Sequence, residues 1–298
     1  MTSQRTQGDS LEARYADVCR RVEQAAIKSG RTTNDVILIA VTKNADPEQI
    51  RTLIRMGHKD FGENKVQQLL HRAAMVEELL ARQRLHANTR RGGSPGGGPM
   101  LFGDERVVDV KPMNAATGSA GVRWHMIGHL QRNKARKIVE YVRLVHSVDS
   151  LRLAEELQAI ALKRDCVIEI LLQVNCSGEA TKFGCPLPAA IPLAEQIDTM
   201  VNIRMRGLMT MAPESDNPED ARPTFVRCRE LFEEMRKLGL TDSPRFNLLS
   251  MGMSGDYEVA ISEGANLVRV GSAIFGDAPA AEIPDELPEP EDETEGEI

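Results

Sequence analysis

An unbroken apolar run that ends at a lysine sets the first constraint on the fold. Residues 36–41 are all apolar and mostly β-branched, and Thr42 and Lys43 follow them. Such a run is typical of a strand buried on both faces, and it is too short to cross a membrane. Lys43 falls at the carboxyl end, where β/α proteins carry their chemistry, and shares a strand face with Ile39 and Val41. If this face lines a barrel, partial desolvation makes the amine a nucleophile; otherwise Lys43 is a solvated strand end.

Strands and helices alternate along the rest of the chain. We predict eight strands, at 36–43, 59–64, 122–128, 141–145, 167–175, 203–208, 245–249 and 267–270. Helices are expected at 10–28, 46–57, 65–84, from 129, and at 151–163, 188–200, 220–238, 256–263 and 271–275. This α/β alternation favours a (β/α)8 TIM barrel. An open doubly wound sheet is the alternative, but no G-x-G-x-x-G follows the first strand.

Two segments do not fit this alternation. Residues 85–121 include the glycine- and proline-rich stretch 92–99, which predicts a disordered surface insertion. Residues 277–298 carry ten acids and no base, so we predict a disordered acidic tail. The other 276 residues carry 37 bases and 34 acids, a net charge of +3. We therefore expect one domain, residues 1–276, and no nucleic-acid partner, since the Arg90–Arg91 pair is better explained as part of a flexible linker.

Cysteine usage and the amino terminus bear on the compartment. The five cysteines are odd in number and form no C-x-x-C pair, which argues against a disulfide framework and a zinc site. Residues 1–10 are polar and contain no apolar core, so a signal peptide is not expected. These features favour a cytoplasmic protein without a membrane or a metal partner.

Two short loops after the last two predicted strands are rich in small and hydroxyl-bearing residues. They contain Ser250, Met251, Gly252, Ser254, Gly271 and Ser272. Barrels often bind phosphate in these loops, together with a short extra helix. Backbone N–H groups in glycine-containing loops can close on an anion. The alternative is a pair of ordinary helix caps, since serine is also a preferred cap residue.

An arginine in an otherwise apolar strand completes the pattern. Arg269 lies two residues before Gly271, and no strand of a closed barrel has a free edge. An inward arginine must find an acceptor, because an unpaired buried charge is costly. Together with Lys43 and the two loops, Arg269 suggests a phosphorylated aldehyde held as a Schiff base. Pyridoxal 5′-phosphate is the natural candidate.

The sequence resembles a known family in several motifs. They are residues 40–43 (AVTK), 61–64 (FGEN), 124–134 (WHMIGHLQRNK), 206–211 (RGLMTM), 250–254 (SMGMS) and 268–276 (VRVGSAIFG). In these it is similar to the pyridoxal phosphate homeostasis protein family, whose single domain resembles the barrel domain of alanine racemase. The resemblance covers about residues 11–276, apart from the insertion.

The resemblance implies roles for individual residues. Lys43 would carry the cofactor as a Schiff base, and Arg269 would face its pyridine nitrogen. The phosphate loops would be those named above, and Asn64 would lie on the cofactor side. His125 and Met209 lie at strand ends, either against the cofactor or in packing. The family usually has a second lysine where this chain has Ala45, which places any transfer role of that lysine in doubt.

Three functions remain open at this point. The first is a protein that binds pyridoxal phosphate for vitamin B6 homeostasis and supplies apo-enzymes without substantial turnover, as a monomer or weak homodimer. The second is an amino-acid racemase or a related lyase, and a racemase needs a second base besides Lys43. The third is a Schiff-base aldolase, which would use Lys43 without a cofactor.

Overall fold

Eight parallel strands close into a barrel in the computed structural model, which describes residues 10–90, 121–179, 183–240 and 245–276. In barrel order the strands are β1 (Ile37–Val41), β2 (Asp60–Glu63), β3 (Arg123–Met126), β4 (Val142–Val148), β5 (Ile168–Asn175), β7 (Ile203–Met209), β8 (Leu248–Ser250) and β9 (Leu267–Val270). The pairing of β9 with β1, which sets Arg269 opposite Ile39, closes the ring. The predicted (β/α)8 barrel is confirmed.

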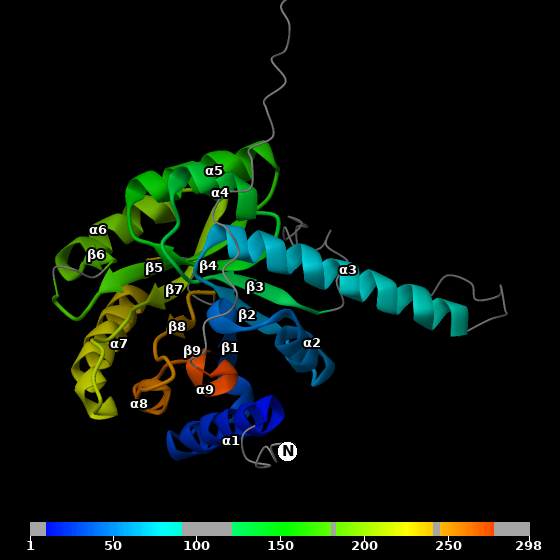
Figure 1. Ribbon diagram of the computed structural model, residues 1–298. Helices are drawn as coiled ribbons and strands as arrows, with labels where there is room; N and C mark the ends of the chain where they lie inside the picture. The colour runs from blue at the N-terminus through cyan, green and yellow to red at the C-terminus, as the bar shows by residue number, and fades with distance from the viewer. Residues whose placement is uncertain (1–9, 91–120, 180–182, 241–244, 277–298) are drawn as a thin grey trace, which may run out of the picture.

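Helices surround the strands on the outside (Figure 1). They are α1 (Leu11–Lys28), α2 (Pro47–Arg55), α3 (Val66–Arg90), α4 (Arg132–Ile138), α5 (Leu151–Lys163), α6 (Leu187–Asp198), α7 (Arg222–Lys237), α8 (Tyr257–Ser262) and α9 (Ser272–Phe275). Short 3-10 turns are η1 (Thr33–Asp35), η2 (Thr42–Asn44) and η4 (Pro218–Ala221). Local sequence explains several helix starts. The Ser10 side chain accepts a hydrogen bond from the Ala13 N–H, and Asp46 and Gln49 cap α2 reciprocally before Pro47.

The structure differs from the predicted elements in several places. Strand β1 ends at Val41, so Lys43, predicted as the last residue of this strand, lies on the 3-10 turn η2 instead. Helix α3 continues to Arg90, six residues into the predicted insertion, and extends beyond the barrel (Figure 1). The physical reason is that residues 85–90 contain no glycine or proline, and Gly92 is the first helix breaker. A two-residue strand, β6 (Cys185–Pro186), pairs with β5 and was too short to predict. Strand β8 begins at Leu248 rather than at residue 245. The remainder of the insertion and the whole acidic tail lie outside the described residues.

The apolar core has two parts. The larger part lies between the strands and the helices. The smaller part fills the barrel and consists of Ile39, Leu144, Leu171, Met209 and Leu267. Such interiors are usually filled by branched apolar side chains in layers. Here several strands instead point polar side chains inward, and these define the region between the apolar filling and the mouth.

Candidate functional site

Lys43 lies on the short turn η2 that follows β1, and its side chain is exposed. Hydrogen bonds to Glu63 and from Arg72 hold both ends of this turn. The Thr42 hydroxyl donates to the Glu63 carboxylate, and the Ala45 carbonyl accepts a hydrogen bond of 3.0 Å from Arg72 Nη2. The position of Lys43 is therefore fixed by its neighbours. Among the described residues no carboxylate pairs with Lys43, so its ammonium is available to a ligand.

A buried ion pair supports this turn. Arg72 on α3 contacts the carboxylate of Glu63 at the end of β2, and the two side chains are 5% and 0% exposed. Burial raises the pKa of Glu63, although the nearby Arg72 acts in the opposite direction. Neither residue was predicted from the sequence as part of the site. The FGEN motif marks Glu63, but nothing in the sequence identifies Arg72 as its partner.

Arg269 is a buried cation whose contacts are neutral. Its Nη1 donates to Ser250 Oγ at 2.6 Å, and its Nη2 donates to the Thr210 carbonyl at 3.0 Å. Burial lowers the pKa of Arg269 to about 10, so it is still charged at neutral pH. No described carboxylate forms an ion pair with it. A guanidinium in this environment favours a ligand that offers a lone pair or a negative charge.

The two predicted phosphate loops meet beside the Lys43 turn. Ser254 Oγ accepts hydrogen bonds from the N–H groups of Gly271 and Ala273, at 3.2 and 3.4 Å, and so joins the loop after β8 to the start of α9. A Cβ on Gly271 would lie 3.2 Å from the Val41 carbonyl, which shows how closely the ends of β9 and β1 approach. Ser272 is exposed next to this junction. Lys43, Ser254, Gly271 and Ser272 are therefore brought to one rim of the barrel.

Asn64 and Gly252 have features that bear on ligand binding. The Oδ1 atom of Asn64 is buried and has no hydrogen-bond partner among the described residues. Gly252 has φ +92°, and a Cβ there would lie 2.6 Å from the Ala260 Cβ and 2.8 Å from the Tyr257 Cα. Only glycine suits both this conformation and this packing. The loop after β8 therefore lies tightly against α8.

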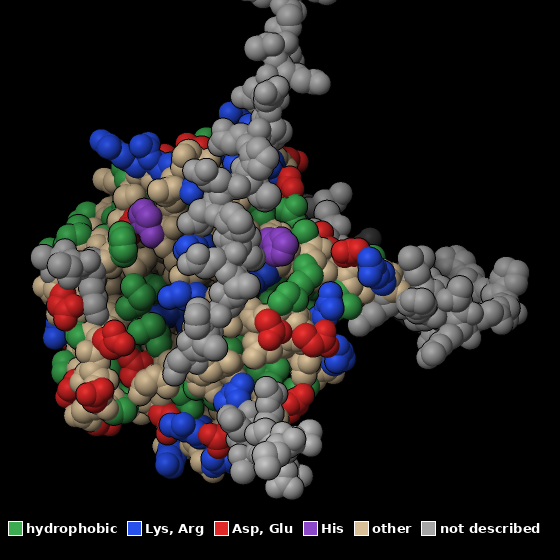
Figure 2. Space-filling view, viewed as in Figure 1, with side chains coloured by type: hydrophobic (Ala, Val, Ile, Leu, Met, Phe, Trp, Pro, Cys, Tyr) green, Lys and Arg blue, Asp and Glu red, His purple; other side chains and the backbone are tan. Residues whose placement is uncertain are grey.

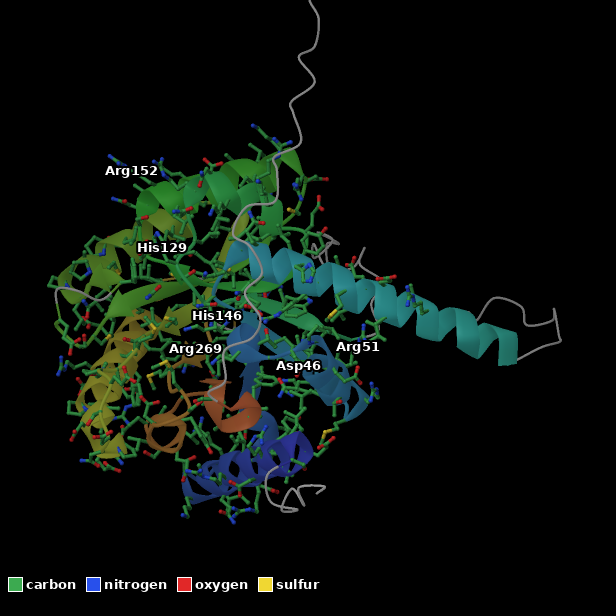
Figure 3. The ribbon with its side chains drawn as sticks, viewed as in Figure 1. Asp46, Arg51, His129, His146, Arg152 and Arg269 are labelled. Carbon is green, nitrogen blue, oxygen red and sulfur yellow. The ribbon has the colours of Figure 1, made fainter. Side chains whose placement is uncertain are left out.

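The remaining predicted residues lie deeper in the molecule. Met209 belongs to the apolar filling of the barrel, and Met251 is fully buried in the outer core. His125 is 3% exposed and Ser250 is 0% exposed. The contacts of these two residues lie within the barrel, with His146 between them. Figure 3 shows His146 and Arg269 near the centre of the barrel and His129 and Asp46 farther out.

A row of polar side chains thus continues from Arg269 through the barrel interior. His146 on β4 lies between Ser250 and His125, and His125 lies 3.1 Å from Asp60 at the start of β2. The sequence analysis missed His146 and Asp60. Their signal is faint, because a single histidine or aspartate in an apolar strand does not reveal the partner it faces on another strand.

Comparisons with known proteins identify the family and the fold of this chain. The alanine racemase N-terminal domain family matches residues 26–279. Pyridoxal phosphate homeostasis proteins of Aquifex aeolicus and Pseudomonas aeruginosa are 34% and 35% identical to this chain over 264 and 268 residues. These matches cover 89% and 90% of this chain and 96% and 95% of the relatives.

Solved structures of two other proteins are similar to this fold. An unknown protein from Bifidobacterium adolescentis superimposes with a TM-score of 0.74 at 31% identity, covering 92% of this chain and 98% of that one. PipY of Synechococcus elongatus with pyridoxal phosphate bound gives a TM-score of 0.63 at 28% identity, covering 87% and 100%.

The fold and the sequence match define a (β/α)8 barrel of the alanine racemase N-terminal type. Within this class, the chain belongs to the pyridoxal phosphate homeostasis protein family. The resemblance in the sequence motifs is confirmed. No helix in the described part of the chain is long and apolar enough to span a membrane.

Proposed function

We propose that this protein binds pyridoxal 5′-phosphate at the mouth of its barrel and keeps it available to the cell, as part of vitamin B6 homeostasis. The observation that carries this proposal is the placement of Lys43, which lies beside the two glycine- and serine-containing loops at one rim of the barrel. An amine next to a phosphate cradle suits a phosphorylated aldehyde. PipY, a relative, is known with pyridoxal phosphate bound.

The residues present fit this cofactor. Bound pyridoxal phosphate supplies an aldehyde that reacts with amines and a ring that withdraws electrons. Lys43 offers the ε-amine, and Ser272 and the loop N–H groups would face the phosphate. Arg269 would donate to the ring nitrogen, and the unpaired Oδ1 of Asn64 can accept from a ligand hydroxyl. This donor set supports pyridoxal phosphate over a Schiff-base aldolase, which would give the buried Arg269 no ligand atom to bind.

We further propose that the protein holds the cofactor without substantial turnover. Arg269 is a donor only and cannot pass a proton to the ring nitrogen in the way an acid does, so electron withdrawal by the ring is weak. A racemase also needs a second base, usually a tyrosine. None of the three tyrosines of this sequence is placed for that role: Tyr15 bonds to His58, Tyr257 packs under Arg21, and Tyr141 precedes β4.

The proposal also covers the partners, the cellular location and the oligomeric state of the protein. The exposed side chain of Lys43 favours reversible loading, so apo-enzymes that depend on pyridoxal phosphate are the proposed recipients. The face of the barrel seen in Figure 2 shows Lys and Arg side chains around its centre, which suits an anionic cofactor. We propose a cytoplasmic protein that acts as a monomer or weak homodimer.

Borohydride reduction tests the attachment to Lys43. The purified protein is incubated with pyridoxal phosphate, its absorbance spectrum is recorded, and the reduced protein is mapped by peptide mass spectrometry. We expect a protein that is yellow before reduction, loses this band on reduction and then carries the cofactor on Lys43. Lys43→Ala should show no such band. Lys65→Ala, which removes another exposed lysine near the mouth, is the matched control and should behave like the wild type. A protein that stays colourless with added cofactor would rule the proposal out.

A further inference from the structure

Five side chains form a continuous hydrogen-bonded row through the barrel interior. Arg269 Nη1 lies 2.6 Å from Ser250 Oγ, and Ser250 Oγ lies 3.0 Å from His146 Nδ1. His146 Nε2 lies 3.0 Å from His125 Nδ1, and His125 Nε2 lies 3.1 Å from Asp60 Oδ1. All five residues are at most 7% exposed. The proposed contact of Arg269 with the ring nitrogen of the cofactor accounts for only one end of this row.

The two ends of the row fix the direction of every hydrogen bond in it. A guanidinium only donates and a carboxylate only accepts, so Ser250 accepts from Arg269 and His125 Nε2 donates to Asp60. A neutral imidazole has one donor and one acceptor. His125 Nδ1 therefore accepts from His146 Nε2, and His146 Nδ1 accepts from the Ser250 hydroxyl. Every donor then points from Arg269 towards Asp60.

The reverse direction would require a charged imidazole inside the barrel. If Ser250 gave its proton to a ligand instead, His146 would have to donate to Ser250, and His125 would need protons on both nitrogens. Guanidinium groups lie at both ends of the row, Arg269 at one and Arg123 beside Asp60 at the other. Other titratable groups that face the row are His58, near His125, and Asp256 and Cys228, near Arg269. A charged His125 would place a third positive charge in a buried row whose one carboxylate, Asp60, already pairs with Arg123.

We propose that His146, His125 and Asp60 are positioning residues that hold the Arg269 guanidinium in place through Ser250. Because the Ser250 hydroxyl donates its hydrogen bond to His146, it cannot also donate one to the phosphate. The phosphate is left to Ser272 and the loop N–H groups. This inference rests on the proposed function, since it assigns these residues a role toward bound pyridoxal phosphate.

The first experiment examines the row without any cofactor. Nitrogen-15 NMR of histidine-labelled protein reports which ring nitrogen carries the proton. We expect the ring proton of His146 on Nε2 and no proton on Nδ1 of His125, and a changed His146 Nδ1 signal in Ser250→Ala, which lacks the hydroxyl donor. A proton on His146 Nδ1 would overturn the proposal. Since no ligand is present, this result does not depend on whether the protein binds pyridoxal phosphate.

The second experiment compares affinities for pyridoxal phosphate and pyridoxal. If Ser250 acts only through Arg269, Ser250→Ala weakens both ligands by a similar factor, about tenfold or more, since a hydrogen bond to a charged group is lost. His146→Leu should weaken both ligands in the same way, and the double variant should be no worse than either single variant. Ser272→Ala should weaken pyridoxal phosphate alone.

Controls keep this comparison interpretable. Ser147→Ala changes the next residue of β4, whose buried hydroxyl has no partner among the described residues, and should leave both affinities unchanged. His146→Asn keeps one donor and one acceptor and should recover part of the loss. If Ser250→Ala weakens pyridoxal phosphate and leaves pyridoxal unchanged, Ser250 grips the phosphate and the proposal is wrong. If the wild type binds neither ligand, the proposed function fails, and the NMR result alone decides the direction of the row.

Discussion

The Arg72 guanidinium and the Glu63 carboxylate form an ion pair beneath the Lys43 turn, with side chains that are 5% and 0% exposed. Arg72 also donates to the Ala45 carbonyl, and Glu63 accepts from Thr42. The two partners therefore hold both flanks of the turn. Removing one partner of a buried pair leaves an uncompensated charge, which costs far more than breaking an exposed pair.

Replacing Arg72 should therefore destabilise the protein strongly. We expect Arg72→Met to lower the free energy of unfolding by about 3–5 kcal/mol, measured by urea denaturation. Arg82→Met is the matched control, because Arg82 is on the same helix and pairs with Glu78 in an ion pair that is 71% and 63% exposed. This control should cost less than about 1 kcal/mol. Equal losses in the two variants would contradict the structural role of the buried pair.

Asp60 should make the free energy of unfolding depend on pH in the acidic range. Burial favours its neutral form, but hydrogen bonds from His125 and Arg123 lower the pKa of Asp60 to about 2, against 3.8 for a free side chain. A lowered pKa gives stability that is present above pH 4 and is lost as the pH falls from about 4 to 2. The difference between the two pKa values of Asp60 corresponds to a free energy of unfolding of about 2 kcal/mol.

Asp60→Asn tests this linkage. Unfolding free energies measured by denaturant at pH 7 and at several values between 4 and 2 should show a loss at pH 7 and a flatter dependence below pH 4. Asp17→Asn, which removes an exposed ion pair with Arg20, should change stability by less than about 1 kcal/mol. An unchanged slope below pH 4 in Asp60→Asn would mean that Asp60 is not the group responsible.

The barrel could be predicted from the sequence because its signals are local. The apolar run at 36–41, the capping residues Ser10 and Asp46 and the glycines that end helices each depend on neighbouring residues. The insertion boundary was misplaced at 85, because glycine and proline content marks where a helix must have stopped and not how far it continues. The two-residue β6 forms only because β5 is beside it, so no local pattern indicates it.

The site could be predicted only in part, for a related reason. Lys43 and Arg269 are conspicuous, because Lys43 comes just after an apolar run and Arg269 interrupts an apolar strand. Partners that meet across the barrel are not marked in the sequence: Arg72 comes from a helix to a strand end, and His146 faces residues on two other strands. Strands β3 and β8 were predicted, yet the side chains of His125 and Ser250 lie in the interior.

Turnover is expected to be absent or slight in the loaded protein. Arg269 is a donor only, and no tyrosine of the sequence is placed as a second base, so proton transfer at the α-carbon of an amino acid lacks a partner for Lys43. Chiral chromatography of L-alanine incubated with loaded protein should show no racemisation above the level of free pyridoxal phosphate. In a parallel assay, the loaded protein is mixed with an apo-enzyme that depends on pyridoxal phosphate. We expect the apo-enzyme to gain activity as the cofactor is transferred to it. Sustained racemisation that disappears in Lys43→Ala would support the racemase alternative instead.

The loop after β8 should tolerate alanine at one glycine and not at another. Gly252 has φ +92°, and a Cβ there would lie 2.6 Å from the Ala260 Cβ, whereas a Cβ on Gly255 would meet nothing within 4 Å. We expect Gly252→Ala to lower the free energy of unfolding by about 1–3 kcal/mol and to weaken pyridoxal phosphate binding, since the loop must move away from α8. Gly255→Ala should leave both nearly unchanged or raise stability slightly. Urea denaturation and absorbance titration measure the two effects. If Gly252→Ala lost stability and kept full cofactor affinity, this loop would support the fold without forming the phosphate site.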